Sequence, residues 1–187
     1  MWNPTVFILS GPAWVGKTTL WHEIESTTPH VSKVITTTSR GAREWEVDGQ
    51  HYYFISRKEF EDTIHTGGFI EYALVHTNYY GSTDRELARI IAEEKSPLYI
   101  IEPQGMVHLK PLLESRGYSV VTIFLLPPSL EELKTRLHQR GTETAEQFEI
   151  RLATAMHELE QQEFYDIRLV NDELEKTKME LRTLLSM

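Results

Sequence analysis

One segment combines a glycine-rich turn with a lysine and a hydroxyl side chain. Residues 11–18 read G-P-A-W-V-G-K-T, after the apolar run 6–9 and before a helical pattern that starts at Thr19. Between a strand and a helix, the N–H groups of such a loop form a nest for phosphate at the helix N-terminus. Lys17 can then reach the β- and γ-phosphates of a nucleotide, and the Thr18 hydroxyl can join the shell of a Mg²⁺ ion. The alternative is a chance pattern in an ordinary strand-to-helix turn.

Two arginines and two glutamates could bind a second substrate. Arg40 and Arg43 lie three residues apart in a polar, turn-rich segment. The planar fork of an arginine suits a phosphate group, although a solvated loop can carry the same pair without binding anything. Glu71 and Glu102 fall within apolar, strand-like runs, where a buried carboxylate is costly unless it is paired or hydrogen-bonded. We therefore expect both glutamates to bind a polar partner, with an exposed strand edge as the alternative.

Strand-like and helix-like segments alternate along most of the chain. Strands are expected over residues 6–9, 34–38, 51–55, 69–75, 98–102, 120–126 and 167–170. Helices are expected over residues 19–26, 57–66, 84–95, 104–115, 130–140, 145–163 and 173–185, several of them behind a Ser or Thr cap. Residues 78–82 are expected to form a loop. This order predicts an α/β fold with a mostly parallel sheet covered by helices on both faces. Residues 36 to about 75 break the alternation and are expected to form a small lobe inserted into the core.

The composition excludes several classes of protein. With 187 residues and no cysteine, the chain can bury one core without disulfides, and thiolate metal sites are excluded. A net charge of −9 argues against a general nucleic-acid or membrane surface. The first residues lack the features of a signal peptide, and no run approaches the roughly 20 apolar residues that span a bilayer. We expect a cytoplasmic protein whose partners are small molecules.

In the order and spacing of its motifs, the sequence resembles the guanylate kinases of the P-loop nucleoside monophosphate kinase family. The resemblance covers nearly the whole chain. Besides the phosphate loop, the family's arginine-loop, F-I-E-W, N-Y-Y-G-S, D-x-Q-G, lid and V-N-D segments have counterparts at residues 38–54, 69–72, 78–82, 102–105, 136–152 and 170–172. Six ordered matches are far more specific than any one of them.

The resemblance implies both an architecture and an activity. The architecture is a single P-loop NTPase domain with its core over residues 1–35, 84–135 and 152–187, a GMP-binding lobe over 36–83 and a helical lid over 136–151. The implied activity is a phosphotransferase reaction of purine nucleotide metabolism. ATP, with Mg²⁺, would phosphorylate GMP or dGMP to the diphosphate.

The resemblance also assigns roles to individual residues. It implies ATP binding by Gly11, Pro12, Ala13, Trp14, Val15, Gly16, Lys17, Thr18 and Thr19, with Thr18 as the metal ligand. It implies GMP binding by Thr36, Arg40, Arg43, Tyr52, Glu71, Tyr80, Ser82 and Glu102. The arginines and tyrosines of that set would hold the phosphate, the glutamates would accept from guanine N–H groups, and Thr36 and Ser82 would donate to guanine O6. The implied catalytic residues are Lys17, Arg40, Arg136, Arg140 and Arg151.

The sequence departs from the family pattern at several positions near the expected site. Ile100 stands where the family usually has an acid close to Mg²⁺ and the lysine, so we expect weakened rather than abolished catalysis. Pro103 restricts the backbone beside Glu102 and could re-aim that carboxylate. Trp14 replaces a usual glycine, where it could lie near the nucleotide or pack against the lid.

Two other functions fit parts of the sequence. One is a guanylate-kinase-like module that binds phosphorylated peptides without catalysis. Ile100 favours it, but such modules typically lose the phosphate loop that this chain keeps. The other is a related kinase of a non-guanine phosphate ester, which the joint presence of Glu71, Ser82 and Glu102 disfavours. The sequence leaves the oligomeric state open.

Overall fold

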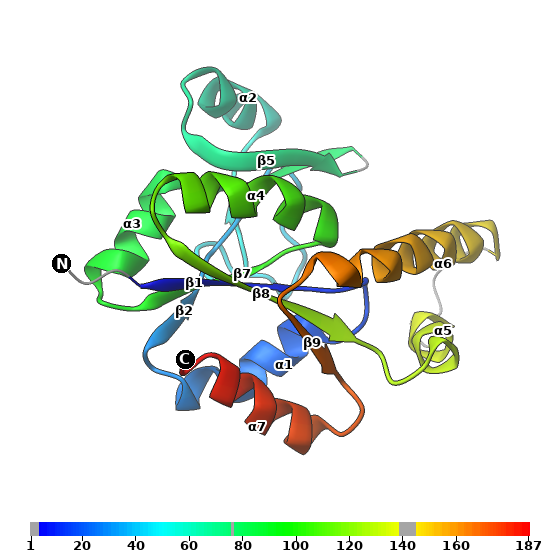
Figure 1. Cartoon of the computed structure of the whole chain (residues 1–187). Helices are drawn as coiled ribbons and strands as arrows, with labels where there is room; N and C mark the ends of the chain where they lie inside the picture. The colour runs from blue at the N-terminus through cyan, green and yellow to red at the C-terminus, as the bar shows by residue number, and fades with distance from the viewer. Residues whose placement is uncertain (1–3, 76, 139–144) are drawn as a thin grey trace.

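The strands of the chain form two sheets, of which the larger is parallel and carries helices on both faces (Figure 1). These statements refer to residues 4–75, 77–138 and 145–187, which the computed structural model describes. The five strands of the larger sheet run in the order β2-β7-β1-β8-β9, and each pairing is parallel. Their bounds are β1 Thr5–Ser10, β2 Val31–Lys33, β7 Ser96–Ile100, β8 Ser119–Leu126 and β9 Ile167–Val170. The expected parallel α/β architecture is confirmed.

Strand β1 is central and is buried on both faces. Phe7 and Leu9 belong to one apolar cluster, whereas Val6 and Ile8 belong to another. Because side chains alternate across a strand, one continuous apolar run supplies both layers. The helices that complete the first cluster are α1 (Lys17–Ile24) and α7 (Leu174–Leu184), and those that complete the second are α3 (Asp84–Ala92) and α4 (Pro103–Ser115). Packing on both faces fixes the carboxyl end of β1, from which the glycine-rich loop begins.

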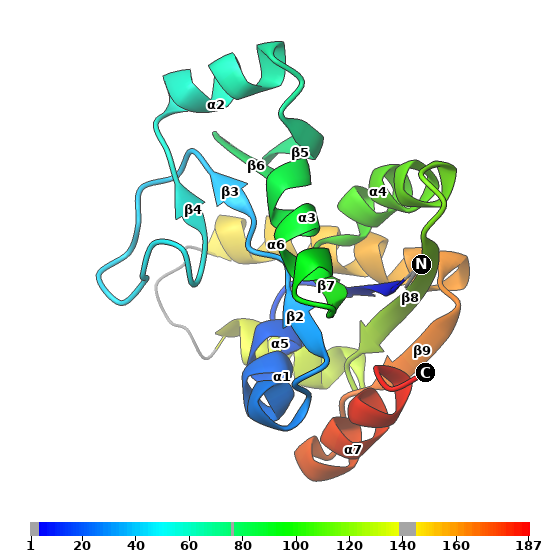
Figure 2. The ribbon, with the colours of Figure 1, turned by 90° about the vertical axis from the view of Figure 1, so that its left-hand side faces the viewer.

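The smaller sheet lies beside the larger one and has the strand order β4-β3-β6-β5 (Figure 2). Its elements are β3 Thr37–Thr38, β4 Tyr53–Phe54, helix α2 Arg57–His65, β5 Phe69–Val75 and β6 Asn78–Thr83. Helix α2 covers one face, where the Phe60 ring stacks on those of Phe69 and Tyr79 at centroid distances of 4.2 Å and 5.2 Å. Ser56 and Glu59 form the expected capping box at the start of this helix.

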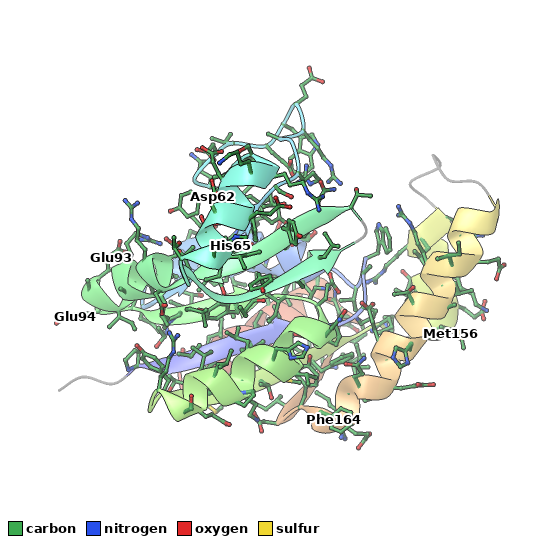
Figure 3. The ribbon with its side chains drawn as sticks, turned by 90° about the horizontal axis from the view of Figure 1, so that it is seen from above. Asp62, His65, Glu93, Glu94, Met156 and Phe164 are labelled. Atoms are coloured by element: carbon green, nitrogen blue, oxygen red, sulfur yellow. The ribbon has the colours of Figure 1, made fainter. Side chains whose placement is uncertain are left out.

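Two further helices lie near the carboxyl ends of β1 and β8 (Figure 1). They are α5 (Leu130–His138) and α6 (Ala145–Glu160), and the short 3₁₀ helices Glu25–Thr27 and Gln161–Phe164 follow α1 and α6. Buried Leu133, Leu137 and Ala155 join α5 to α6 in a third apolar cluster. Seen from above, α6 with Met156 lies at one side of the molecule, and Glu93 and Glu94 lie at the other (Figure 3). No helix within the described residues has the length and apolarity needed to cross a membrane.

The segment 34–38, expected to be one strand, is divided between the two sheets. The Val34 N–H donates to the carbonyl of Leu98 in the larger sheet at 2.9 Å. Strand β3 of the smaller sheet begins only at Thr37. The chain therefore passes from one sheet to the other within residues 34–36.

Residues 78–82, expected to be a loop, form most of strand β6. This strand pairs antiparallel with β5 on one side and with β3 on the other. Its polar, glycine-containing sequence lacks the pattern of a strand, so its conformation is set by its neighbours. The expected strand 51–55 is also shorter in the structure, where β4 covers only Tyr53–Phe54.

Candidate active site

The glycine-rich loop joins β1 to α1, as the sequence predicts. Gly11 and Gly16 have φ angles of 149° and 102°, which other residues rarely adopt. A Cβ on Gly11 would lie 2.4 Å from the carbonyl oxygen of Leu125, and one on Gly16 would lie 2.8 Å from the Asn171 amide nitrogen. Both positions therefore require glycine. The same Asn171 amide donates to the Val15 carbonyl at 2.8 Å, which ties the residue after β9 to the loop.

The side chain of Lys17 is buried against the loop. Its Nζ donates to the carbonyl oxygens of Gly11 at 2.6 Å and Pro12 at 3.0 Å. It also lies 3.5 Å from Oε2 of Glu102. Helix α1 starts at this lysine, and Thr18 is exposed in its first turn. An ammonium group and a helix N-terminus at one place can together neutralise bound phosphates.

Trp14, in the middle of the loop, packs against α5 and α6. Its backbone has a φ of 62°, in the left-handed region. Its half-buried side chain contacts the apolar cluster of Leu133, Leu137 and Ala155. The guanidinium carbon of Arg151 lies 4.9 Å from the indole centroid. Of the two positions that the sequence left open for this tryptophan, the structure has the one against the helices that flank and include the expected lid, α5 and α6.

The expected lid arginines have different environments. Arg136 pairs with Glu132 one turn earlier on α5, with 3.0 Å from Nε to Oε1, and its Nη1 donates to the carbonyl of Val15 at 3.4 Å. Arg151 is stacked over Trp14. Arg140 lies outside the described residues. Both described arginines therefore contact the phosphate loop.

The phosphate loop is one region that could bind a ligand, and a cavity of about 280 Å³ is another. This cavity, which we name the second cavity, lies between the smaller sheet and the β7–α4 connection. Its lining includes five of the eight residues expected to bind GMP, namely Thr36, Tyr52, Glu71, Tyr80 and Glu102. Ile100 and Ile101 at the end of β7 supply an apolar part of the wall. Aromatic, apolar and acidic groups in one cavity suit a planar base that carries hydrogen-bond donors.

Glu71 and Ser82 form a hydrogen-bonded pair at this cavity. They face each other across β5 and β6, and the fully buried Ser82 hydroxyl donates to Oε1 of Glu71 at 2.9 Å. Burial raises the pKa of Glu71, and the hydrogen bonds with Ser82 offset only part of that effect. The carboxylate is thus oriented by a neighbour and remains an acceptor for a ligand.

The arginine loop is organised around Glu46, a carboxylate that sequence reasoning did not single out as a site residue. Arg40 pairs with Glu46 at 2.7 Å, and the Arg43 N–H donates to its other oxygen at 2.8 Å. The Arg40 guanidinium lies 5.6 Å from the ring centroid of Tyr52, a residue of the cavity wall. Burial would raise the pKa of Glu46, but the hydrogen bonds and charges of Arg40 and Arg43 together outweigh it and lower that pKa. An acid three residues after the second of two spaced arginines, in one short loop, was the available signal.

Glu102 does not lie within a strand, which corrects the expectation from sequence. Strand β7 ends at Ile100, and Glu102 is the N-cap residue of α4, with Pro103 at the first helical position. Its side chain is half-exposed, lines the second cavity and lies close to Lys17. This carboxylate is therefore the point where the cavity and the phosphate loop meet.

A sequence model described as Guanylate kinase matches residues 3–187 of this chain. The chain belongs to the guanylate kinase family. The family assignment made from the motifs is therefore confirmed, and so is the expectation that the chain is a nucleoside monophosphate kinase.

Individual relatives agree with this assignment over nearly the whole chain. The guanylate kinase of Protochlamydia amoebophila is 41% identical over 182 residues, which cover 97% of this chain and 89% of the relative. That of Sulfurimonas denitrificans is 36% identical over 177 residues, with 95% and 84% covered. The crystal structure of guanylate kinase from Anaplasma phagocytophilum superposes with a TM-score of 0.77 at 30% identity, covering 98% of this chain and 85% of that one.

The position at which guanylate kinases usually have an acid is apolar here. Ile100 is partly buried and packs against the cluster beneath α1. Within the described residues, no group of three or more His, Asp or Glu side chains could hold a metal ion by itself. The exposed Thr18 hydroxyl suits a Mg²⁺ ion that arrives with a nucleotide and is held mainly by its phosphates and water.

A second carboxylate lies beside the loop, and the sequence does not predict it because nothing in the spacing of helix α6 distinguishes it. Oε2 of Glu158 accepts a hydrogen bond from the Ala13 N–H at 3.3 Å. Burial and the charge of Glu102 raise the pKa of Glu158 to about 7, against the opposing charge of Lys17. In this guanylate kinase family member, an acid from α6 therefore accepts a hydrogen bond from an N–H group of the phosphate loop.

Proposed function

We propose that this protein transfers the γ-phosphoryl group of ATP to GMP or dGMP. The main support is that the two sites are adjacent. Glu102 lines the second cavity, and its carboxylate lies 3.5 Å from Nζ of Lys17 in the phosphate loop. An oxygen of the acceptor phosphate attacks the γ-phosphorus, and the bond from that phosphorus to the β–γ bridging oxygen breaks. ADP and GDP, or dGDP, are the products.

The acceptor's base is proposed to bind in the second cavity. The carboxylates of Glu71 and Glu102 accept from N1–H and the exocyclic amine of guanine, and the hydroxyl of Thr36 donates to O6. Adenine has neither an N1–H nor an amine at C2, so binding it would leave Glu71 without a donor from the ligand. A site built on such bonds can reject the wrong partner by about 10⁴–10⁵-fold.

The acceptor's phosphate is proposed to bind among Arg40, Arg43, Tyr52 and Tyr80. Arginine forks suit two-point contacts with phosphate oxygens, and the tyrosine hydroxyls complete the set. Glu46 supports this site because it already fixes Arg40 and the backbone of Arg43. The phosphate would then lie on the side of the cavity that the arginine loop borders.

The donor's phosphates are proposed to bind along residues 11–19. The N–H groups of the loop and of the start of α1 donate hydrogen bonds to the phosphate oxygens, and Lys17 moves from the loop carbonyls to the β- and γ-phosphates. Mg²⁺ bound with ATP would neutralise phosphate charge, with the Thr18 hydroxyl as its protein ligand. The apolar Ile100 leaves that ion without a carboxylate from β7, which supports a reduced kcat.

The lid arginines are proposed to act during transfer. Arg136, Arg140 and Arg151 would neutralise charge on the moving phosphoryl group and exclude water from it. We propose the corresponding division into a core (1–35, 84–135 and 152–187), a GMP-binding lobe (36–83) and a lid (136–151). All proposed substrates are small cytoplasmic metabolites, so we place the reaction in the cytoplasm.

The test is ADP release in a coupled assay with ATP and Mg²⁺. The acceptors are GMP, dGMP, AMP, CMP and UMP, with a reaction lacking acceptor as the blank and Lys17→Met as the check for contaminating kinases. Turnover that requires GMP or dGMP and disappears in Lys17→Met is expected. GMP binding by calorimetry without any turnover would replace this proposal with a non-catalytic binding module. Turnover of a phosphate ester that lacks guanine would identify a different kinase.

A further inference from the structure

Three consecutive residues of the phosphate loop contact helices α5 and α6, which we name the lid helices here. The Ala13 N–H donates to Glu158 of α6, the Trp14 ring lies under Arg151 of α6, and the Val15 carbonyl accepts from Arg136 of α5. Arg151 and Glu158 are seven residues apart, about two turns, and so lie on the same face of α6. One face of this helix therefore runs along the loop.

Trp14 makes the most extensive of these contacts and adopts an unusual backbone to do so. A φ of 62° is uncommon for any residue other than glycine, and more so for a bulky one. The conformation persists because the indole packs into the apolar cluster of α5 and α6, which includes Leu133 and Leu152. The side chain thus joins the loop to both lid helices.

The indole also stacks on an arginine of α6. Arg151 is exposed on that helix, and ordering a long exposed side chain costs rotamer entropy that its contacts must offset. Its guanidinium lies 4.9 Å from the centroid of the Trp14 ring, within the range of a cation–π contact. Arginine stacks well on aromatic faces because its charged group is planar. Arg151 is consequently held over the loop that is proposed to bind the ATP phosphates.

We propose that Trp14 is a positioning residue for phosphoryl transfer: its ring holds the Arg151 guanidinium beside the phosphate loop before ATP binds. The proposal rests on the function proposed above. A glycine at residue 14 could bind phosphate equally well through its N–H, so the ring acts on the placement of Arg151 rather than on ATP affinity. Loss of the Trp14 ring should therefore lower kcat and leave the KM for ATP nearly unchanged.

A double-mutant cycle tests the link between the two residues. Kinetic constants are measured for the wild type, Trp14→Gly, Arg151→Ala, the double variant and Trp14→Phe. Glycine is chosen because it accepts the observed φ, so the loop backbone is not strained by the change. Trp14→Gly is expected to lower kcat by about tenfold and Arg151→Ala by about 100-fold, with the KM for ATP within about threefold in both. The double variant should match Arg151→Ala within about twofold, because the ring has no role without its arginine.

Two further variants separate positioning from packing. Trp14→Phe keeps an aromatic face and should retain kcat within about threefold of the wild type. Leu113→Ala removes a buried leucine from the apolar cluster of α3 and α4 instead, and leaves the stacked pair in place. It should lower the melting temperature while kcat stays within about threefold of the wild type.

Several outcomes would overturn the inference. Independent effects, with the double variant about 1,000-fold below the wild type, would show that Trp14 does not act through Arg151. A kcat for Trp14→Gly equal to or above that of the wild type would show that the ring is not needed or holds Arg151 in an unproductive place. A loss of kcat in Leu113→Ala as large as that in Trp14→Gly would show that the effect is a general loss of stability. A wild type without GMP kinase activity would instead refute the proposed function.

Discussion

The hydroxyl of Ser82 donates a hydrogen bond of 2.9 Å to the carboxylate of Glu71 at the wall of the second cavity. The sequence led us to expect Ser82 to donate to guanine O6. A hydroxyl has a single proton, and in this structure it is directed to Glu71. Ser82 therefore orients the Glu71 carboxylate, and under the proposed function it would act on guanine through that glutamate.

Replacing Ser82 by alanine should weaken GMP binding selectively. The buried carboxylate would lose a hydrogen bond to a charged group, worth about 1.5–3 kcal/mol. We expect the KM for GMP to rise by about tenfold or more, while the KM for ATP changes by less than about twofold. Steady-state kinetics with each substrate varied in turn measures both. Equal increases in the two KM values would indicate general loosening of the fold.

The loss of GMP affinity at acidic pH should follow the protonation of Glu71. Burial raises its pKa above the usual value of 4.5, and only the ionised form accepts from both guanine donors. Affinity for GMP should therefore be full at neutral pH and fall as the pH drops through the raised pKa. In Glu71→Gln the affinity should be lower at neutral pH and its acidic decline should disappear. Calorimetric titrations across the pH range test this, and an unchanged decline in the variant would assign it to another group.

ATP binding should take up protons at Glu158. Its pKa is raised to about 7, and phosphates bound beside it would raise that pKa further because they disfavour a second negative charge. If the pKa rises by about one unit, about half a proton is taken up near pH 7.5. Calorimetry without Mg²⁺, in buffers of different ionisation enthalpy, measures the uptake. Glu158→Gln should abolish it, and persistent uptake in that variant would place the proton elsewhere.

Restoring an acid at residue 100 should exchange stability for activity. Ile100 packs against the cluster beneath α1 and lines the second cavity. Ile100→Glu should raise kcat by about three- to tenfold by adding a carboxylate near the metal-bearing phosphates. The same change should cost about 1–3 kcal/mol of stability, because an apolar contact is lost and a charge is partly buried. Kinetics and urea unfolding measure the two effects, and an unchanged kcat would remove the argument for a missing acid.

Glu86 should be a major contributor to stability. Its carboxylate is almost fully buried and accepts hydrogen bonds from the Ile35 N–H, the Tyr53 hydroxyl and two nitrogens of Arg89. Glu86→Ala should lower the free energy of unfolding by about 3–5 kcal/mol, because Arg89 and Tyr53 lose a buried partner. Glu93→Ala removes a partly exposed partner of the same arginine and should cost less than about 1 kcal/mol. Equal effects of the two variants in urea unfolding would contradict this.

The contribution of Glu86 should also depend on pH. Burial would raise its pKa, but the hydrogen bonds from Arg89, Ile35 and Tyr53 outweigh it and lower the pKa below 4.5. A lowered pKa in the folded state means that this stabilisation is complete above the pKa of the unfolded chain. It is lost as the pH falls through the folded-state value. The wild type should therefore lose more stability than Glu86→Ala between neutral and acidic pH.

Local patterns were enough to predict the phosphate loop and most of the larger sheet. The loop combines a buried strand with glycines whose positions are fixed by backbone geometry, and both signals are local. The helix caps at Ser56 and Thr83 were likewise predicted from spacing alone and are present in the structure. These features depend on residues that are near one another in the chain.

The features that the sequence did not reveal depend on distant partners. Strand β6 has a polar sequence and owes its conformation to β5 and β3. Glu158 contacts Ala13 across 145 residues of chain, and no spacing in α6 encodes that contact. Glu102 was different, since Pro103 at a first helical position could have indicated that the strand had already ended.

The chain crosses between its two sheets at residues 34–36 and again where β6 meets α3, and Glu86 is bonded at both crossings. Ile35 donates to its carboxylate, and its own N–H is capped by Thr83. A single carboxylate therefore holds together the two segments through which the chain passes between its sheets. Protonation of Glu86 should loosen these connections before the larger sheet unfolds, so residues 37–83 would gain hydrogen exchange while β1 and β8 stay protected. The smaller sheet would then be the acid-labile part of the molecule.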